Sequence, residues 1–396
     1  MSHPHGPPPE EVIRRRERAR KQPPGRDITP AVGTRGAPAR WRRAVEGASV
    51  ALARPAWGDA RWSYLYGREG AARYGSDRPA DGEVAAAARR MRGGREVPVP
   101  ALGPFINPPV WTWEVPVYFW FGGMATGSSF AALAADVAGD HRAAALARKV
   151  TLAAVLPCAP LLILDLGRPL RFLHMLRIFK PRSAMSMGAW CLVAFTNGAV
   201  AAVGADLLGR PRLARTAGAA TGLLGTYLGS YTGVLLAATA VPVWARSRAY
   251  LPAIFMCTAA ATGAAANRLA LAATGRPPGD PSRQALGVLE TLAMACELVL
   301  SGVNERRLGR LAESLERDTP GRWFSVAKWT VRGGLALRLA GRRAPWLQHV
   351  TSGLFLAGAL AFRMGWVGAG RTSAHDDEAV ALMARRKARP LGREPV

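Results

Sequence analysis

The chain has 396 residues, of which 49% are hydrophobic, and its 53 Lys and Arg residues outnumber its 27 Asp and Glu residues to give a formal net charge of +26 at pH 7. In a soluble protein such a charge indicates nucleic-acid binding. Here many basic residues lie in short loops between apolar segments or in the two tails, which is where the topology signals of membrane proteins lie. We therefore expect a lipid bilayer around the protein and no nucleic-acid partner.

Residues 1–105 form a basic, Pro- and Arg-rich N-terminal extension. Its composition up to about residue 40 predicts disorder. No apolar stretch in the extension has the length of a signal-peptide core. Aromatic residues follow that could pack on a partner or form a loosely ordered segment beside the membrane, and these are Trp41, Trp57, Trp62, Tyr64 and Tyr66.

Apolar stretches of about 20 residues follow, each long enough to cross a bilayer as a helix. They are 114–137, 149–166, 185–208, 217–243, 250–273, 285–303 and 346–369. A further stretch, 324–341, contains Lys328, Arg332 and Arg338, so it predicts either another span or an amphipathic helix at the membrane surface. The sequence therefore predicts an all-α polytopic membrane protein, with about eight transmembrane helices at 106–370 and a basic C-terminal tail at 371–396.

The basic loops suggest an orientation. With an even number of spans, both termini lie on one side, and the loops on that side contain Arg171, Arg177, Lys180, Arg246 and Arg306 among others. These loops are only slightly more basic than the opposite ones, and the basic extension at 1–105, which has no signal-peptide core, decides in favour of the cytoplasm. We expect a multi-pass protein of the cell (inner or plasma) membrane with both termini in the cytoplasm.

Cysteine and histidine usage limits the redox groups that the chain could hold. Cys158, Cys191, Cys257 and Cys296 each fall alone in a different span, and no histidine lies deep in a span. Iron–sulfur clusters need arrays of cysteines, and membrane haems need facing axial ligands such as histidine. We therefore expect neither haem nor an iron–sulfur cluster in this chain, so any electron carrier would be a diffusible quinone.

The first four spans bring polar residues toward the side of the membrane that holds the N-terminus. Charged groups at this depth are costly and indicate function. Asp165 and Arg168, three residues apart, could instead only fasten a helix end, and Trp190 could be an interfacial anchor. The candidate residues are Glu114, Tyr118, Asp165, Arg168, His174, Ser186, Trp190 and Tyr231.

Two acids lie on the sixth span, seven residues apart. Glu290 and Glu297 could form a proton path, or they could make a structural polar contact to Arg268. Both interpretations explain why acids would occur in an apolar helix.

Three motifs carry a family resemblance: Pro109-Val-Trp111-Thr-Trp113-Glu114, Asp165-Leu-Gly-Arg168-Pro169 and Lys180-Pro-Arg-Ser183-Ala-Met185-Ser186. With Ser230-Tyr231-Thr232-Gly233 they make residues 105–370 similar to the NrfD-like, or polysulfide reductase, integral-membrane subunits. The long N-terminal extension departs from the family pattern, as does Ala184, where many relatives are expected to have Pro.

The resemblance implies a haem-free membrane anchor with a quinone-handling four-helix bundle in its first half. It would pass electrons between menaquinone or ubiquinone and a ferredoxin-like iron–sulfur subunit, which serves a molybdopterin catalytic subunit. A quinone needs an apolar slot and hydrogen-bond donors, and its reduction takes up protons. The candidate quinone-binding residues are Tyr118, Arg168, His174, Ser186, Trp190 and Tyr231, and the candidate proton relay is Glu114 and Asp165.

Other functions remain open at this stage. A secondary transporter also holds buried charge, although it more often shows repeated halves with broken helices at the bilayer midplane. A structural anchor without quinone chemistry is the other alternative. The substrate of the attached catalytic subunit could be formate, polysulfide or thiosulfate, as in anaerobic respiration, and a cytoplasmic partner would favour a formate dehydrogenase complex.

Overall fold

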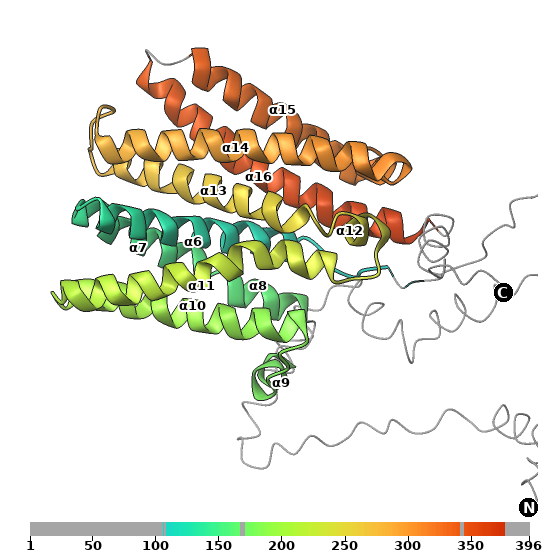
Figure 1. The fold of residues 1–396 in the computed structure, drawn as a ribbon, viewed down its shortest axis with the longest axis horizontal. Coiled ribbons are helices and arrows are strands. Elements are labelled where there is room, and N and C mark those ends of the chain that lie inside the picture. The colour runs from blue at the N-terminus through green and yellow to red at the C-terminus, as the bar shows by residue number, and fades with distance from the viewer. Residues whose placement is uncertain (1–105, 107, 167–170, 341–343, 377–396) are drawn as a thin grey trace, which may run out of the picture. The chain divides into compact units, whose positions relative to one another are not determined.

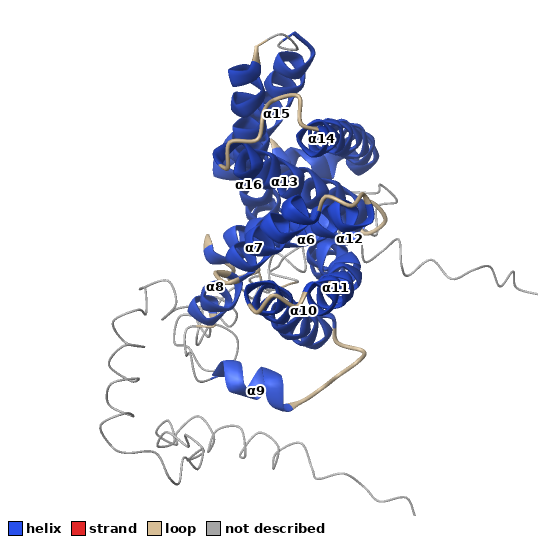
Figure 2. Ribbon diagram, turned by 90° about the vertical axis from the view of Figure 1, so that its left-hand side faces the viewer, coloured by secondary structure: helices blue, strands red, loops and turns tan. Residues whose placement is uncertain are grey.

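The computed structural model describes residues 106, 108–166, 171–340 and 344–376. Within these ranges the chain forms helices and short connections and no strand, which confirms the predicted all-α fold (Figures 1 and 2). The N-terminal extension predicted at 1–105 and the tail beyond residue 376 lie outside the described residues.

The helices overlap the predicted apolar stretches but differ at several ends, since α7 begins at His141 rather than near 149 and the predicted span 217–243 is broken after Ala237. Pro157, which lacks a backbone N–H, falls at the break between two helices that together match the predicted span 149–166. The helices in chain order are α6 Glu114–Val137, α7 His141–Val155, α8 Cys158–Asp165, α9 Arg171–Arg177, α10 Ala184–Leu207, α11 Pro211–Ala237, α12 Pro242–Arg246, α13 Leu251–Ala273, α14 Pro281–Leu308, the 3-10 helix η1 Gly309–Leu315, α15 Asp318–Ala340 and α16 Pro345–Ala374.

Among the described residues, 5 helical stretches are long and apolar enough to cross a membrane. They are His141–Asp165, Ala184–Leu207, Leu251–Ala273, Pro281–Leu315 and Trp346–Ala374. The chain is therefore a multi-pass membrane protein. The helices α6, α11 and α15 are about as long but are not among these five stretches, so the predicted number of about eight spans stays a prediction.

The helices divide into two groups that meet along α6 and α13. The first group contains α6, α7, α8, α10 and α11, and the second contains α13, α14, α15 and α16 (Figure 2). Gly127 of α6 faces Gly263 of α13 so closely that a Cβ atom on either glycine would overlap the backbone of the other helix. Small residues allow membrane helices to approach in this way.

The helices run back and forth between two ends, which we call the α9 end and the Asp140 end. At the α9 end lie the start of α6, the short helices α9 and α12, and the last turn of α16 (Figure 1). The Asp140 end holds the α6–α7 and α13–α14 connections, where Asp140 accepts hydrogen bonds of 2.6 and 2.8 Å from Arg276 and of 2.7 Å from Ser282. This ion pair ties the two groups together outside the spans.

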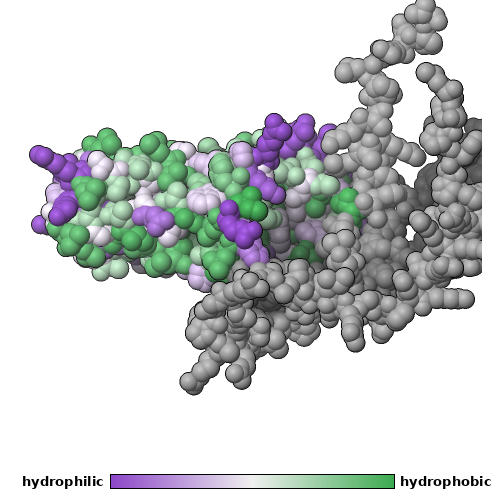
Figure 3. Space-filling view, turned by 90° about the horizontal axis from the view of Figure 1, so that it is seen from below, coloured by the Kyte–Doolittle hydropathy of each residue, from purple (hydrophilic) through white to green (hydrophobic). Residues whose placement is uncertain are grey.

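Apolar side chains cover the outer faces of the helices. On α14, Val288 and Leu292 are about 60% exposed and Val299 is 65% exposed, and Leu223 on α11 is 69% exposed. Figure 3 shows hydrophobic residues over much of the described surface, with hydrophilic ones gathered mainly toward the extremities. An exposed apolar surface of this extent fits lipid as the surrounding solvent.

Candidate functional site

A cavity of about 220 Å³ lies in the first group near the α9 end. This is several times the ~30 Å³ that a water molecule occupies in the liquid. Its wall comes from α6, α8, α9, α10 and α11 and is mostly apolar. The polar side chains on it are Tyr118, Asp165, Thr196, Asn197 and Tyr231, and the larger apolar ones include Trp111, Phe119, Leu162, Phe172, Met175, Met185 and Leu192.

Two tyrosines from different helices line this cavity. Tyr118 of α6 and Tyr231 of α11 are both 3% exposed. Tyr231 fits because residue 188 on α10 is a glycine, and a Cβ atom there would overlap the tyrosine ring. Tyr227 stacks on the outer side of Tyr231 with ring centroids 5.8 Å apart. Both cavity tyrosines carry a phenol that can donate or accept a hydrogen bond.

Two carboxyl groups lie at the α9 end of the first group. Asp165 ends α8 and lines the cavity, whereas Glu114 begins α6, is buried, and accepts a hydrogen bond from Thr112. Arg371, in the last turn of α16, lies close enough for its charge to act on both acids. Its guanidinium also donates to the carbonyl oxygens of Pro109 and Trp111, which holds the segment before α6 in place.

The remaining predicted residues lie elsewhere or have other contacts. His174 is exposed on α9, and Arg168 lies outside the described residues. Ser186 accepts a hydrogen bond of 3.0 Å from the Lys180 backbone N–H and lies 3.3 Å from the Ile178 carbonyl, so its hydroxyl fixes the α9–α10 connection. Trp190 packs edge-on against Phe179.

The structure thus brings Tyr118, Asp165 and Tyr231 together at the cavity with Glu114 near Asp165. It does not place His174, Ser186 or Trp190 on the cavity wall.

Sequence reasoning missed several residues of this site. The sequence predicts that Arg371 begins the basic C-terminal tail, whereas α16 continues to Ala374 and brings this residue back to the segment before α6. Trp111 is not among the predicted site residues, but it lines the cavity and stacks on Trp244 with centroids 5.5 Å apart. Asn197, a polar residue in the middle of a predicted span, was the signal that could have been used.

The fold and the cavity define a class, a multi-pass α-helical membrane protein with an apolar cavity and acidic groups near one end. The family model "Polysulphide reductase, NrfD" matches residues 104–372, which is more than half of the chain, and the chain belongs to this family. Members of this family are membrane subunits of molybdopterin oxidoreductase complexes and associate with iron–sulfur and molybdopterin subunits. The match confirms the predicted resemblance. A comparison with curated proteins gives no match.

Proposed function

We propose that the chain is the quinone- or quinol-interacting subunit of its complex, in the cell membrane with both termini in the cytoplasm. It passes electrons between the quinone pool and a ferredoxin-like iron–sulfur subunit, which serves the molybdopterin catalytic subunit. The observation that carries the proposal is the mostly apolar cavity on which Tyr118, Asp165 and Tyr231 converge.

The residues of the cavity suit the chemistry of a quinone. The apolar wall would hold the ring of menaquinone or ubiquinone, and the phenols of Tyr118 and Tyr231 can donate hydrogen bonds to its carbonyl oxygens. The quinone itself supplies the two-electron chemistry, while the protein supplies placement and proton transfer. Asp165, on the wall, and Glu114, which is close enough for its charge to act on Asp165, can relay the protons.

The position of the cavity suggests where the partner binds. The cavity lies near the α9 end, so an iron–sulfur subunit bound at this end has the shortest route for electrons to the quinone. We place the partner there, on the cytoplasmic side. The reaction of this chain is then the quinone half of an oxidoreductase reaction, and the substrate is converted on another subunit.

The test is turnover with a soluble quinone analogue, normalised to assembled complex. Asp165→Asn removes the proton carrier and should reduce turnover about 10²–10⁴-fold. Tyr231→Phe removes one hydrogen-bond donor and should also reduce turnover. The matched control is Tyr227→Phe, which changes a tyrosine that is stacked on Tyr231 but lies off the cavity wall, so its turnover should match the wild type. Normal turnover per assembled complex in both Asp165→Asn and Tyr231→Phe would contradict the proposal.

A further inference from the structure

The buried face of α14 carries polar residues along the whole length of the helix, with apolar residues such as Met294 between them. Arg283, Glu290, Glu297 and Asn304 recur every seventh residue, and each is at most 4% exposed. Seven residues advance a helix by about 10 Å, so the four side chains span about 30 Å. That length matches the ~30 Å hydrocarbon core of a bilayer. We call the buried polar side chains that gather along this face of the second group the α14 column.

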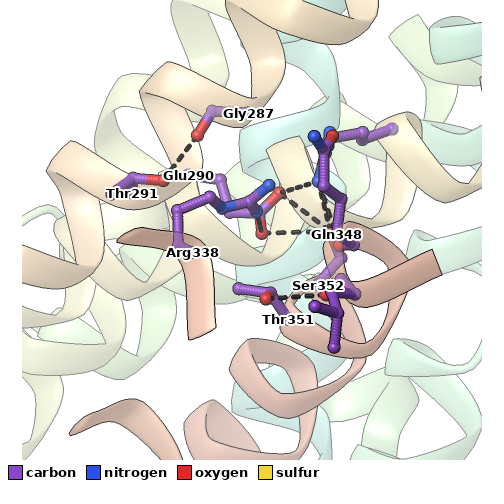
Figure 4. Close-up of polar contacts among 9 residues, drawn as sticks. Gly287, Glu290, Thr291, Arg338, Gln348, Thr351 and Ser352 are labelled. Atoms are coloured by element: carbon purple, nitrogen blue, oxygen red, sulfur yellow. Dashed lines mark hydrogen bonds and ion pairs between the residues drawn. The ribbon is translucent and has the colours of Figure 1, made fainter. Parts of the chain in front are cut away.

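Near the Asp140 end, the α14 column is a cluster of charged and polar groups from four helices. Glu290 accepts hydrogen bonds from Arg338 of α15 and from Ser352 of α16, whose hydroxyl lies 3.0 Å from both carboxylate oxygens (Figure 4). Arg268 of α13 donates to Ser352 at 3.1 Å and lies 3.9 Å from Glu290. Gln348, half-buried near the start of α16, accepts hydrogen bonds from Arg268 on its backbone carbonyl and its side-chain oxygen. It extends the cluster toward the Asp140 end.

In the middle of the α14 column lie a second acid and a buried cation. Glu297 accepts a hydrogen bond of 2.7 Å from Ser301 one turn further on. Arg363 of α16 is 0% exposed, and its charge acts on Glu297. Its Nη1 lies 3.3 Å from the Ala359 carbonyl oxygen, but its Nε and Nη2 have no hydrogen-bond partner in the protein. Buried hydrogen-bond donors without a protein partner are usually satisfied by ordered water molecules.

Toward the α9 end, the α14 column reaches groups that are partly exposed. Asn304 donates to the Ser247 hydroxyl at 3.0 Å. The next residue, Glu305, pairs with Lys328 at 2.5 Å, and both side chains are between 20 and 25% exposed. Polar groups therefore recur from one end of the second group to the other, and the buried apolar cluster that contains Met294 and Phe355 lies between the levels of Glu290 and Glu297.

Aromatic rings separate the α14 column from the cavity of the first group. Arg363 lies over the ring of Phe255, 5.3 Å from its centroid. Phe255 in turn meets Phe119, which lines the cavity, with centroids 6.1 Å apart. The two polar systems are thus distinct, and the α14 column does not belong to the quinone site.

We infer that the α14 column conducts protons between the two faces of the membrane, with Glu290 and Glu297 as the carboxyl groups that accept and release them. Two buried acids about 10 Å apart can exchange a proton through water held by donors such as those of Arg363. The arrangement suits protons better than metal ions. Arg268, Arg338 and Arg363 lie beside the acids, and the described ranges hold no group of three or more His, Cys, Asp or Glu that could bind a metal ion.

Proton flux through the full-length chain in sealed liposomes tests this inference. A potassium gradient with valinomycin sets the membrane potential, and an enclosed pH-sensitive dye reports the flux. No quinone is present, so the result does not depend on the proposed quinone reaction. Loss of a proton carrier costs about 10²–10⁴-fold, so Glu297→Gln, which keeps the shape of the side chain, should reduce the flux to that of protein-free liposomes.

Two controls distinguish conduction from a folding defect. Glu297→Asp keeps an ionisable group and should retain a measurable part of the flux. Glu313→Gln changes an exposed acid on η1 that pairs with Arg317, outside the α14 column, and should match the wild type. All variants are compared at equal amounts of protein that elutes as a single species in detergent.

The inference is overturned if wild-type flux does not exceed that of protein-free liposomes. It is equally overturned if correctly folded Glu297→Gln conducts protons as fast as the wild type. A flux that disappears when sodium is replaced by choline would show that the α14 column carries sodium and would also contradict the inference.

Discussion

The two helix groups bury polar side chains in different ways. In the first group Tyr118, Asp165 and Tyr231 border a cavity of about 220 Å³. In the second group Glu290 is bonded directly to Arg338 and Ser352. Polar groups around a cavity are available to a ligand, whereas polar groups bonded to one another lower the cost of burying each other inside the membrane. The comparison teaches that buried charge alone does not locate a ligand site.

The largest effect on stability should come from breaking the Glu290 cluster. Glu290→Leu leaves the buried Arg268 and the partly buried Arg338 beside an apolar side chain. Loss of one partner of a buried ion pair costs about 3–5 kcal/mol. We expect a corresponding fall in the free energy of unfolding, measured by thermal unfolding in detergent. Glu290→Leu combined with Arg338→Met should recover much of the loss. A single variant as stable as the wild type would show that the cluster is not needed for folding.

A pair of glycine substitutions compares packing in the two groups. Gly334→Ala on α15 puts a Cβ atom 2.7 Å from the buried ring of Phe355 and should cost about 1–3 kcal/mol of stability. Gly188→Ala pushes on Tyr231, which borders the cavity and can turn into it, so this variant should lose less stability but more quinone turnover.

Gly204→Ala, with nothing near its Cβ position, is the control for both glycine variants. Equal losses of stability in Gly188→Ala and Gly334→Ala would mean that the cavity gives Tyr231 no room to move. The same measurements on the control exclude a general effect of alanine in these helices.

The smallest effect concerns the ion pair at the Asp140 end, which joins the two groups. Hydrogen bonds from Arg276 hold the pKa of Asp140 well below its usual value of 3.8. A carboxyl whose pKa is lower in the folded state stabilises the fold above its unfolded pKa, and this contribution is lost as the pH falls through the folded pKa. Both side chains are partly exposed, so Asp140→Asn should cost only about 1 kcal/mol at pH 7.

The pH dependence of this difference is the measurement. The gap in melting temperature between wild type and Asp140→Asn should be constant near neutral pH and should shrink as the pH falls below about 3.8. A gap that does not change with pH would mean that the carboxylate charge contributes nothing and that the variant acts through the cap of α7 alone.

Much of the fold could be predicted because bilayer thickness imposes helix length on apolar stretches. The convergence of Tyr118, Asp165 and Tyr231 near one end also followed from alternating helix direction. The cavity wall could not be predicted in the same way, since it depends on how helices pack sideways. Ser186 illustrates the limit, because a hydroxyl near a helix start can serve a ligand or the backbone, and here it holds the backbone.

Long-range contacts were the other limit. Arg371 reaches the carbonyl of Trp111, 260 residues earlier in the chain, and no local pattern predicts such a pairing. The α14 column was readable in principle, because Arg283, Glu290, Glu297 and Asn304 share a heptad spacing. Sequence reasoning singled out only the two acids, since an arginine or asparagine near a helix end is usually attributed to the interface.

The direct contact between Gly127 of α6 and Gly263 of α13 has a mechanical consequence. No side chain lies between the two backbones at this point, so nothing there can change rotamer to absorb a displacement. The two helices can only roll or slide against each other as stiff rods. Any tilt of α6, which holds Tyr118, is therefore transmitted at this fulcrum to α13, which holds Arg268.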